Sequence, residues 1–384
     1  MVNLSIEERF LCEGIKHRNY INHEKIAALY GQLGDAVAFK ASQKNGVDSI
    51  IGDSLSLCEG LSVSGKWYDT YIKMDQRIKE YMDELDRVAE ILETGGIQVV
   101  ALKNSGITRS CYLHYGASPM GDLDLLVEKK DFRHAHRILE LNGYKFQYRS
   151  SLEEDSLEWA ESSGGAEYQV TLPSGASLWL ELQWRPIAGR WIQRHQEPCA
   201  SELIARSLPV NGSKVRVLGP EDNLLQIAVH TAKHTYVRAP GFRLHTDVDR
   251  VVRSFSINWD LFIFRVEQCK VKTAVYFSLF LAQHLLETPI PNSVLGKLAP
   301  SQWKKWIILE WLGKVGLFEP DEKKWGRWGY IIFVALLYDN LGHLMRGIFP
   351  PINEIKQQAG QSSRIQLLKA YVVRIKDLVF RRVV

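Results

Sequence analysis

The segment 121–127 (GDLDLLV) constrains the fold of this chain more than any other feature, because it places two acids two residues apart in an apolar run. On a β-strand, alternate side chains point to the same face, so Asp122 and Asp124 project together while Leu123 and Leu125 enter the core. Two carboxylates about 7 Å apart at their Cα atoms can hold a pair of magnesium ions about 4 Å apart. An Asp-x-Asp strand can equally be a solvent-facing acidic edge, so the motif alone does not define a metal site.

A short apolar run rich in β-branched residues, 97–102 (IQVVAL), lies upstream and predicts a buried strand. Lys103, Asn104, Ser105 and Gly106 follow, and we expect a helix after them. Backbone N–H groups in such a turn, together with a helix N-terminus, form a cradle that can bind phosphate. Lys103 and the Ser105 hydroxyl can add contacts to a triphosphate. An ordinary strand-to-helix connection is the alternative.

A third acid is found in the segment 167–184, which predicts a β-hairpin because two strand-like runs flank a Pro-Ser-Gly turn. In its second run, Glu181 alternates with leucines. If this strand lies beside residues 121–127, Glu181 reaches the same face as Asp122 and Asp124. A third carboxylate can orient or deprotonate an acceptor hydroxyl, whereas the alternative is a solvated acid on an exposed strand.

The rest of the chain has mainly helical periodicity. Apolar residues at steps of three and four between Met74 and Leu92 predict a long helix, which the glycine pair 95–96 should end. From Pro220 onward the pattern is almost entirely helical. The predicted fold class is therefore α+β, with a small mixed sheet between helical regions. The expected division is a helical N-terminal region at 1–95, an α/β core at 96–217 and a helical C-terminal domain at 218–384.

Charge, cysteine spacing and hydropathy indicate the kind of compartment and partner that this chain suits. The formal net charge of +4 is small for 384 residues, so it permits contact with nucleic acid without favouring it. The five cysteines are widely spaced and form no Cys-x-x-Cys pair, which suits a reducing compartment. The N-terminal residues lack an apolar signal-peptide region, and the most apolar run, 328–338, is shorter than the roughly 20 residues of a membrane span. We therefore expect a cytoplasmic protein without a transmembrane segment.

Two histidines stand one helical turn apart, His230 and His234, with Lys233 between them. This spacing can bind a metal ion, but no third ligand lies nearby in the sequence, so zinc is not predicted. We interpret His230 and Lys233 as part of a wall that faces phosphate or substrate. A histidine at a helix packing surface is the alternative.

The C-terminal tail, 364–384, predicts a basic amphipathic helix with six Lys or Arg against one Asp. Such a helix can meet a membrane, nucleic acid or a protein partner. We expect the simpler outcome, in which its apolar stripe packs on the domain. The stripe consists of Ile365, Leu368, Val372, Ile375 and Val379.

Taken together, these segments resemble a bacterial family of uncharacterised nucleotidyltransferases within the polymerase-β superfamily. The likeness extends over roughly residues 70 to 380 and is most specific around the two aspartates. The matching pieces are Leu102-Lys103, Tyr115, 119–127, 139–144, Glu181 with Trp184-Arg185, 219–225 with His230 and Lys233-His234, 247–250 and 349–351.

The resemblance implies a polymerase-β-type core that transfers a nucleoside monophosphate from an NTP to an acceptor and releases pyrophosphate. On this basis Asp122, Asp124 and Glu181 ligate two Mg²⁺ ions, and the residues from Lys103 to Gly106, together with Gly121, hold the triphosphate. Relatives resemble accessory enzymes of polysaccharide and modified-peptide biosynthesis, which implies a sugar phosphate or peptide as the acceptor.

Three positions depart from the family pattern. Asn104 stands where the family has glycine, Ser118 where it has arginine, and Gln183 where it has histidine. The first two lie where the triphosphate is expected, so the choice of nucleotide can differ from that of relatives. Three alternatives stay open: an RNA-modifying enzyme similar to nucleotidyltransferase toxins, a relative that transfers a sugar through the same metal site, and a nucleotide-binding module without turnover.

Overall fold

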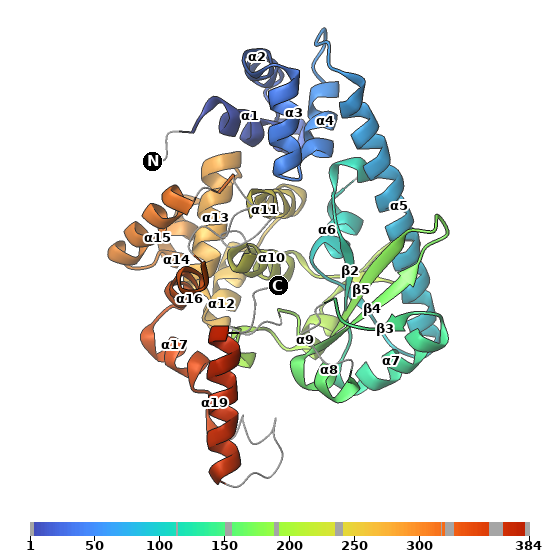
Figure 1. Cartoon of the computed structure of the whole chain (residues 1–384), viewed down its shortest axis with the longest axis vertical. Helices are drawn as coiled ribbons and strands as arrows, with labels where there is room; N and C mark the ends of the chain where they lie inside the picture. The colour runs from blue at the N-terminus through green and yellow to red at the C-terminus, as the bar shows by residue number, and fades with distance from the viewer. Residues whose placement is uncertain are drawn as a thin grey trace.

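The chain is represented by a computed structural model in which a sheet lies among helices (Figure 1). It describes residues 4–112, 114–149, 156–187, 192–234, 241–315, 317–318, 326–352 and 364–380.

Four short helices open the chain and lead into a long fifth one, α5 (Gly65–Thr94). The first helix begins with a capping box, in which Ser5 and Glu8 each accept a hydrogen bond from the other's backbone N–H. The predicted end of α5 is confirmed, since Gly95 caps it and Gly96 has a φ of 76° that suits glycine. The four short helices are α1 (Ile6–Gly14), α2 (His23–Leu33), α3 (Asp35–Lys44) and α4 (Asp48–Ser56).

The sheet has seven strands in the order β3-β4-β5-β2-β1-β7-β6 and contains both parallel and antiparallel pairs, so the predicted mixed sheet is confirmed. At its centre, β2 runs parallel to β5 and antiparallel to β1. The predicted hairpin is formed by β4 and β5. The strands are β1 (Val100–Ala101), β2 (Asp122–Leu126), β3 (Lys145–Phe146), β4 (Gly165–Thr171), β5 (Ser177–Gln183), β6 (Leu208–Pro209) and β7 (Arg216–Val217).

One strand is shorter than expected. The sequence predicted a strand over 97–102, but only Val100 and Ala101 pair with neighbours on both sides. Ile97 and Val99 are nevertheless buried, so the apolar run marks burial correctly and overstates the length of the ladder.

Helices account for most of the remaining chain. Those around the sheet are α6 (Lys103–Cys111), α7 (Phe132–Leu141), α8 (Leu157–Ser163) and α9 (Ala200–Ala205). Those of the C-terminal part are α10 (Pro220–His234), α11 (Leu244–Ser254), α12 (Trp259–Cys269), α13 (Lys272–Leu286), α14 (Asn292–Leu298), α15 (Gln302–Val315), α16 (Gly326–Leu337), α17 (Leu341–Ile348) and α19 (Arg364–Phe380). No helix in the described ranges is both long and apolar enough to span a bilayer.

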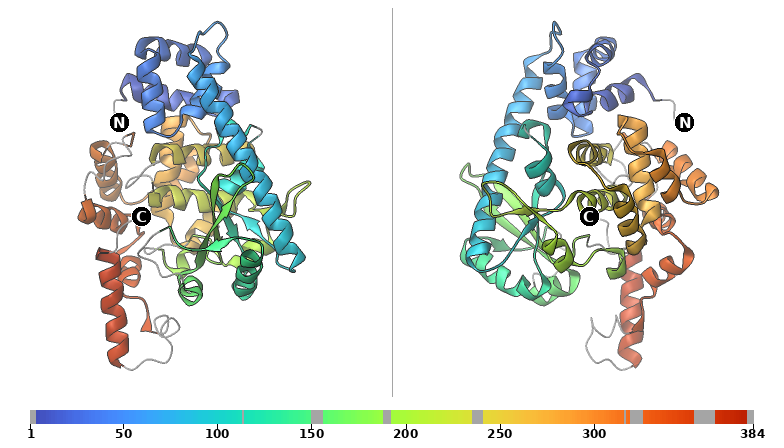
Figure 2. Two further views of the ribbon diagram at one scale, coloured as in Figure 1. Left: turned by 45° about the vertical axis from the view of Figure 1, so that its right-hand side comes forward. Right: turned by 180° about the vertical axis from the view of Figure 1, so that it is seen from behind.

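Packing does not follow the order of the chain. One hydrophobic cluster joins the first four helices to the C-terminal helices α10 to α16. A second cluster joins α5 and α7 to the sheet. The sheet therefore lies between α5 on one side and the C-terminal helices on the other, as the two views of Figure 2 show.

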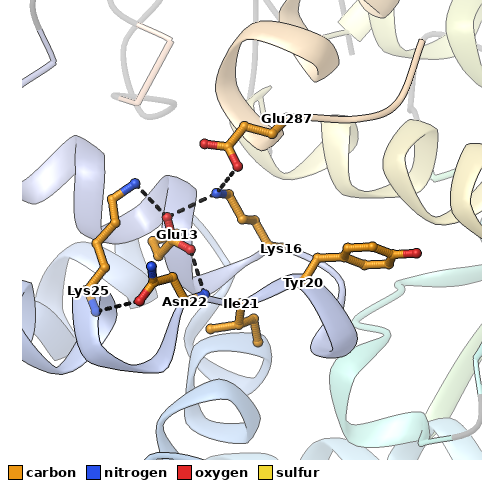
Figure 3. A pocket seen from close by; sticks show the side chains of 7 residues that line it. All are labelled: Glu13, Lys16, Tyr20, Ile21, Asn22, Lys25 and Glu287. Atoms are coloured by element: carbon orange, nitrogen blue, oxygen red, sulfur yellow. Dashed lines mark hydrogen bonds and ion pairs between the residues drawn. The ribbon is translucent and has the colours of Figure 1, made fainter.

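A cavity of about 480 Å³ lies where the N-terminal helices meet the end of α13 (Figure 3). The buried carboxylate of Glu13 accepts from Lys16 Nζ at 3.0 Å, from Lys25 Nζ at 2.8 Å and from the Asn22 N–H at 2.9 Å. Lys16 also pairs with Glu287, at 2.8 Å. Because these charges satisfy one another, we interpret the cluster as a clamp between two parts of the chain.

The C-terminal tail departs from expectation. The apolar stripe of α19 was predicted to pack on the domain, but Leu368, Val372 and Ile375 are exposed. The helix contacts the rest of the described chain through Tyr371, which donates to the Pro350 carbonyl, and through Arg374, which donates to the Gly347 carbonyl. Leu378, near its end, is buried against Val334 and Tyr338. The side chains of Ile365 and Val379 and residues 381–384 lie outside the described part.

Candidate active site

The three predicted acids lie on the adjacent parallel strands β2 and β5. Asp124 is the register partner of Glu181, and Asp122 is the partner of Trp179. Because alternate residues of a strand share a face, the three carboxylates lie on the same face of the sheet. Leu123 points to the opposite face and is fully buried. The structure therefore brings the three acids together, as the sequence predicted.

Lys103 fills the space between two of these acids. Its Nζ donates to Asp124 Oδ1 at 2.6 Å and to Glu181 Oε2 at 3.1 Å. Gln183 donates to the same Asp124 oxygen from Nε2, at 3.0 Å. The Lys103 backbone has a φ of 48°, a left-handed conformation that costs a non-glycine residue about 1 kcal/mol. The expectation for Lys103 was a triphosphate contact, and in this structure its partners are the acids.

Arg149 neutralises the remaining acid and was not identified from the sequence. Its Nη1 donates to Asp122 Oδ2 at 2.7 Å, and it also pairs with Glu167. The guanidinium lies 5.5 Å from the centre of the Trp179 ring, within the range of a cation–π contact. Arg149 lies in a segment without a recognisable motif, so no local pattern indicates its role.

Burial and neighbouring charges shift the pKa values of Asp124 and Glu181 in opposite directions. Burial raises the pKa of Asp124 well above its ordinary value; the Lys103 ammonium lowers it in part, and the charges of Asp122 and Glu181 raise it further. Burial also opposes ionisation of Glu181, but Lys103, a hydrogen bond from Asp124 and the Arg149 charge overcome it and lower its pKa to about 2. The cations around Glu181 thus favour its charged form more than burial opposes it.

The predicted phosphate cradle has a partly structural role. Ser105 is completely buried, and its hydroxyl accepts from the Asp124 N–H at 2.9 Å, so it ties α6 to β2. Gly106 is required by close packing, since a Cβ there would lie 2.6 Å from the Ala101 carbonyl oxygen. Both residues thus have structural contacts in this structure, and their contact with a triphosphate stays a prediction.

Two other residues of the predicted cradle stay accessible. Asn104 lies half-buried in the first turn of α6, at the positive end of the helix dipole. Gly121 precedes β2, is exposed, and has open space where a Cβ would project. Asn104 and Gly121 are thus open to solvent at this edge, and their contact with a nucleotide stays a prediction.

Helix α10 supports the turn through a residue that the sequence did not single out. Gln226 accepts from the Lys103 N–H at 3.0 Å and donates to the Pro186 carbonyl at 2.8 Å. His230 and Lys233 follow at four and seven residues, which places them on the same helix face as Gln226. The rings of His230 and His234 lie 4.6 Å apart between centroids. The separation of four and seven residues from His230 and Lys233 is the sequence signal by which Gln226 could have been identified.

A further arginine reaches the site from the C-terminal part. Arg243 donates to the Pro119 carbonyl, directly before the 121–127 segment. Burial lowers its pKa, while the charges of Asp247 and Asp122 act in the opposite direction. Ser118, at the position where the resemblance implied an arginine, is buried and bonds to Thr108 at 2.6 Å. A cation therefore approaches this segment from Arg243, the N-cap residue of α11, rather than from position 118.

The donor set of the site suits a hard cation. Among the residues that the structure describes, no three His, Cys, Asp or Glu side chains are arranged around a common metal position. Asp122 is paired with Arg149, whereas Asp124 and Glu181 share Lys103. Three carboxylates on one face nevertheless supply the oxygen ligands that Mg²⁺ prefers.

A mixed sheet with acids on two adjacent strands, flanked by helices, is consistent with a nucleotidyltransferase-type core. A family described as uncharacterised nucleotidyltransferase matches residues 38–287, more than half of the chain. The protein belongs to this family, whose general activity is nucleotidyl transfer. No curated protein matches the chain.

Proposed function

We propose that this protein catalyses Mg²⁺-dependent transfer of a nucleoside monophosphate from an NTP to a hydroxyl or phosphate group of a small-molecule, sugar or peptide acceptor. The observation that carries the proposal is the register of β2 and β5, which sets Asp124 beside Glu181 with Asp122 on the same face. The family match supports the class of reaction.

Asp122, Asp124 and Glu181 are the residues that would hold the metal. Bound Mg²⁺ supplies charge stabilisation for the phosphates and aligns the reacting oxygens. With a pKa of about 2, Glu181 is a weak base, so we assign it the role of a ligand rather than that of the group that deprotonates the acceptor.

Cations beside the acids suit a triphosphate. Lys103 and Arg149 contact the carboxylates, and Arg243 reaches the preceding segment from the N-cap position of α11. Together with the N-terminus of α6, they surround the face with positive charge. We propose that Lys103 and Arg149 turn to the phosphates when the nucleotide binds, with Asn104 and Gly121 beside them and His230 and Lys233 along α10.

The test supplies each NTP with Mg²⁺ and candidate sugar phosphates, peptides and RNA, and measures pyrophosphate release and the mass of the acceptor. Asp122→Asn should lower turnover at least about a hundredfold, because it removes a charged ligand of a hard cation. The matched control is Asp131→Asn, an aspartate beyond the end of β2. Full turnover by Asp122→Asn would place the reaction elsewhere.

A nucleotide-binding module without turnover is the second candidate. It is favoured by one observation, namely that all three acids already have Lys or Arg partners. Calorimetry separates the two: NTP binding without pyrophosphate release under any acceptor condition supports the module.

A further inference from the structure

The last four described helices present apolar side chains to solvent. In the described part of the chain, 12 of the 19 large hydrophobic residues that are exposed lie between Trp303 and Ile375. Large exposed apolar patches on soluble proteins mark interaction sites. We call the following set the C-terminal apolar surface: Trp303, Trp306, Trp328, Ile332, Leu341, Met345, Phe349, Ile352, Leu368, Val372, Val373 and Ile375.

These side chains follow helical spacing rather than occurring singly. Leu341 and Met345 are four residues apart on α17, and Leu368, Val372 and Ile375 recur at steps of four and three on α19. The opposite faces of these helices pack against the protein. In α15, Ile308 and Leu312 belong to the cluster that joins the first four helices to α10 to α16. In α16, Val334 packs with Tyr338 and Leu378. Each helix therefore has one packed face and one face whose apolar side chains are exposed in the described part of the chain.

Charge is distributed unevenly between this part and the rest of the chain. Residues 302–384 contain 14 Lys and Arg against 7 Asp and Glu, whereas residues 1–301 contain 34 against 37. The net positive charge of the protein therefore comes from its C-terminal fifth. Among the side chains that the structure describes there, Arg346, Lys369 and Lys376 are exposed against one exposed acid, Glu310. A partner of this surface should therefore be negatively charged as well as able to accept apolar groups.

The surface lies apart from the proposed active site. In Figures 1 and 2, α15, α16 and α17 lie beyond α10 to α13 as seen from the sheet, and α19 extends away from the body of the molecule. A partner seated on α19 and its neighbours would leave the carboxylate face of the sheet open.

We propose that the C-terminal apolar surface docks on an anionic lipid membrane. Exposed tryptophans and aliphatic side chains next to Lys and Arg are the composition of helices that lie in the membrane interface, where apolar groups enter the acyl boundary and cations meet acidic headgroups. A symmetric contact between two copies would set two net positive surfaces against each other. In this proposal the protein lies on the membrane surface, and no helix in the described part of the chain is long and apolar enough to cross a bilayer.

The test is flotation of the full-length protein with phosphatidylglycerol vesicles and with phosphatidylcholine vesicles. We expect binding to phosphatidylglycerol at least about tenfold tighter than to phosphatidylcholine, weakening with added salt. Tryptophan emission should shift to shorter wavelength on binding. Equal affinity for both lipids, or no binding to phosphatidylglycerol, overturns the proposal.

Two variants probe the two components of the surface. Trp303→Ser with Trp306→Ser removes exposed rings, and Lys369→Glu with Lys376→Glu reverses exposed charges on α19. Each should weaken phosphatidylglycerol binding at least about tenfold. These side chains are exposed, so the fold should tolerate the changes, as thermal melting can verify.

The matched control is Tyr68→Ser with Phe264→Ser, which removes two exposed rings outside the surface and should leave vesicle binding unchanged. Light scattering of the wild type tests the alternative that a second copy of the chain covers this surface. A dimer that the Trp303 and Trp306 changes dissociate, without vesicle binding by the monomer, would assign the surface to a second copy and overturn the proposal. None of these measurements depends on nucleotidyl transfer.

Discussion

Replacing Lys103 by methionine tests the electrostatic account of the site without knowledge of the substrate. The substitution keeps an unbranched side chain and removes the ammonium group that bonds to Asp124 and Glu181. Removing one partner of a fully buried ion pair costs about 3–5 kcal/mol. Here the Lys103 side chain is 17% exposed and that of Glu181 is 26% exposed, so solvent screens part of this cost.

We therefore expect Lys103→Met to lower the free energy of unfolding by about 1–3 kcal/mol at pH 8 without metal. Loss of the cation raises the pKa values of both carboxyls in the folded state. A carboxyl with a raised folded pKa contributes stability at low pH that is lost as the pH rises, so the deficit should shrink at acidic pH. Mg²⁺ should also restore stability in the variant more than in the wild type, because it can replace the missing positive charge.

Urea unfolding followed by tryptophan fluorescence, with and without MgCl₂, measures these differences. The matched control is Lys130→Met, whose 71%-exposed side chain pairs with Glu128 and should change stability by less than about 0.5 kcal/mol. If Lys103→Met unfolds at the wild-type urea concentration and Mg²⁺ affects both proteins equally, the carboxylates are not coupled as described. In calorimetry, the variant should also bind NTP about 1–3 kcal/mol more weakly.

Three further outcomes follow from the structure. Asn104→Gly should leave NTP binding unchanged or slightly stronger in calorimetry, since it removes a Cβ near the turn; a marked loss would show that the amide contacts the nucleotide. Glu13→Gln should lower the free energy of unfolding by about 2–4 kcal/mol in urea, because a buried carboxylate bonded to two lysines becomes neutral, and NTP binding should not change. Burial raises the pKa of Asp247 from 3.8 to about 6, so its contribution to stability is present below pH 3.8 and is lost as pH rises through 6. In the Asp247→Asn variant the melting temperature should therefore change less between acidic and neutral pH than in the wild type. An unchanged pH dependence would contradict the raised pKa of Asp247.

The sequence predicted the parts of the fold in which apolar and polar residues recur with the period of a strand or a helix. Apolar and acidic residues alternate in 121–127 and in the second run of the hairpin, which placed Asp122, Asp124 and Glu181 on strands. Because these two strands are adjacent in the sheet, the three acids lie on one face. The long helix and its glycine end followed from steps of three and four.

The contacts that complete the site have no local signature. Arg149 bonds to Asp122 across 27 residues, and Gln226 and Arg243 reach their partners across 123 and 124 residues. Small residues were misleading for a different reason. A serine and a glycine in a turn suit phosphate binding and internal contacts equally, and in this structure Ser105 accepts from the Asp124 N–H while Gly106 packs against the Ala101 carbonyl.

The pairing of the acids has a consequence for ligand binding. Three carboxylates on one face would repel one another in the absence of a cation, and Lys103 and Arg149 remove most of that repulsion before any metal binds. Mg²⁺ bound to the acids would deprive Lys103 of its partners, and a triphosphate would offer it new ones. Each ligand thus lowers the cost of binding the other. If both bind as proposed, their coupling must be reciprocal, so NTP should tighten Mg²⁺ binding by the same factor as Mg²⁺ tightens NTP binding.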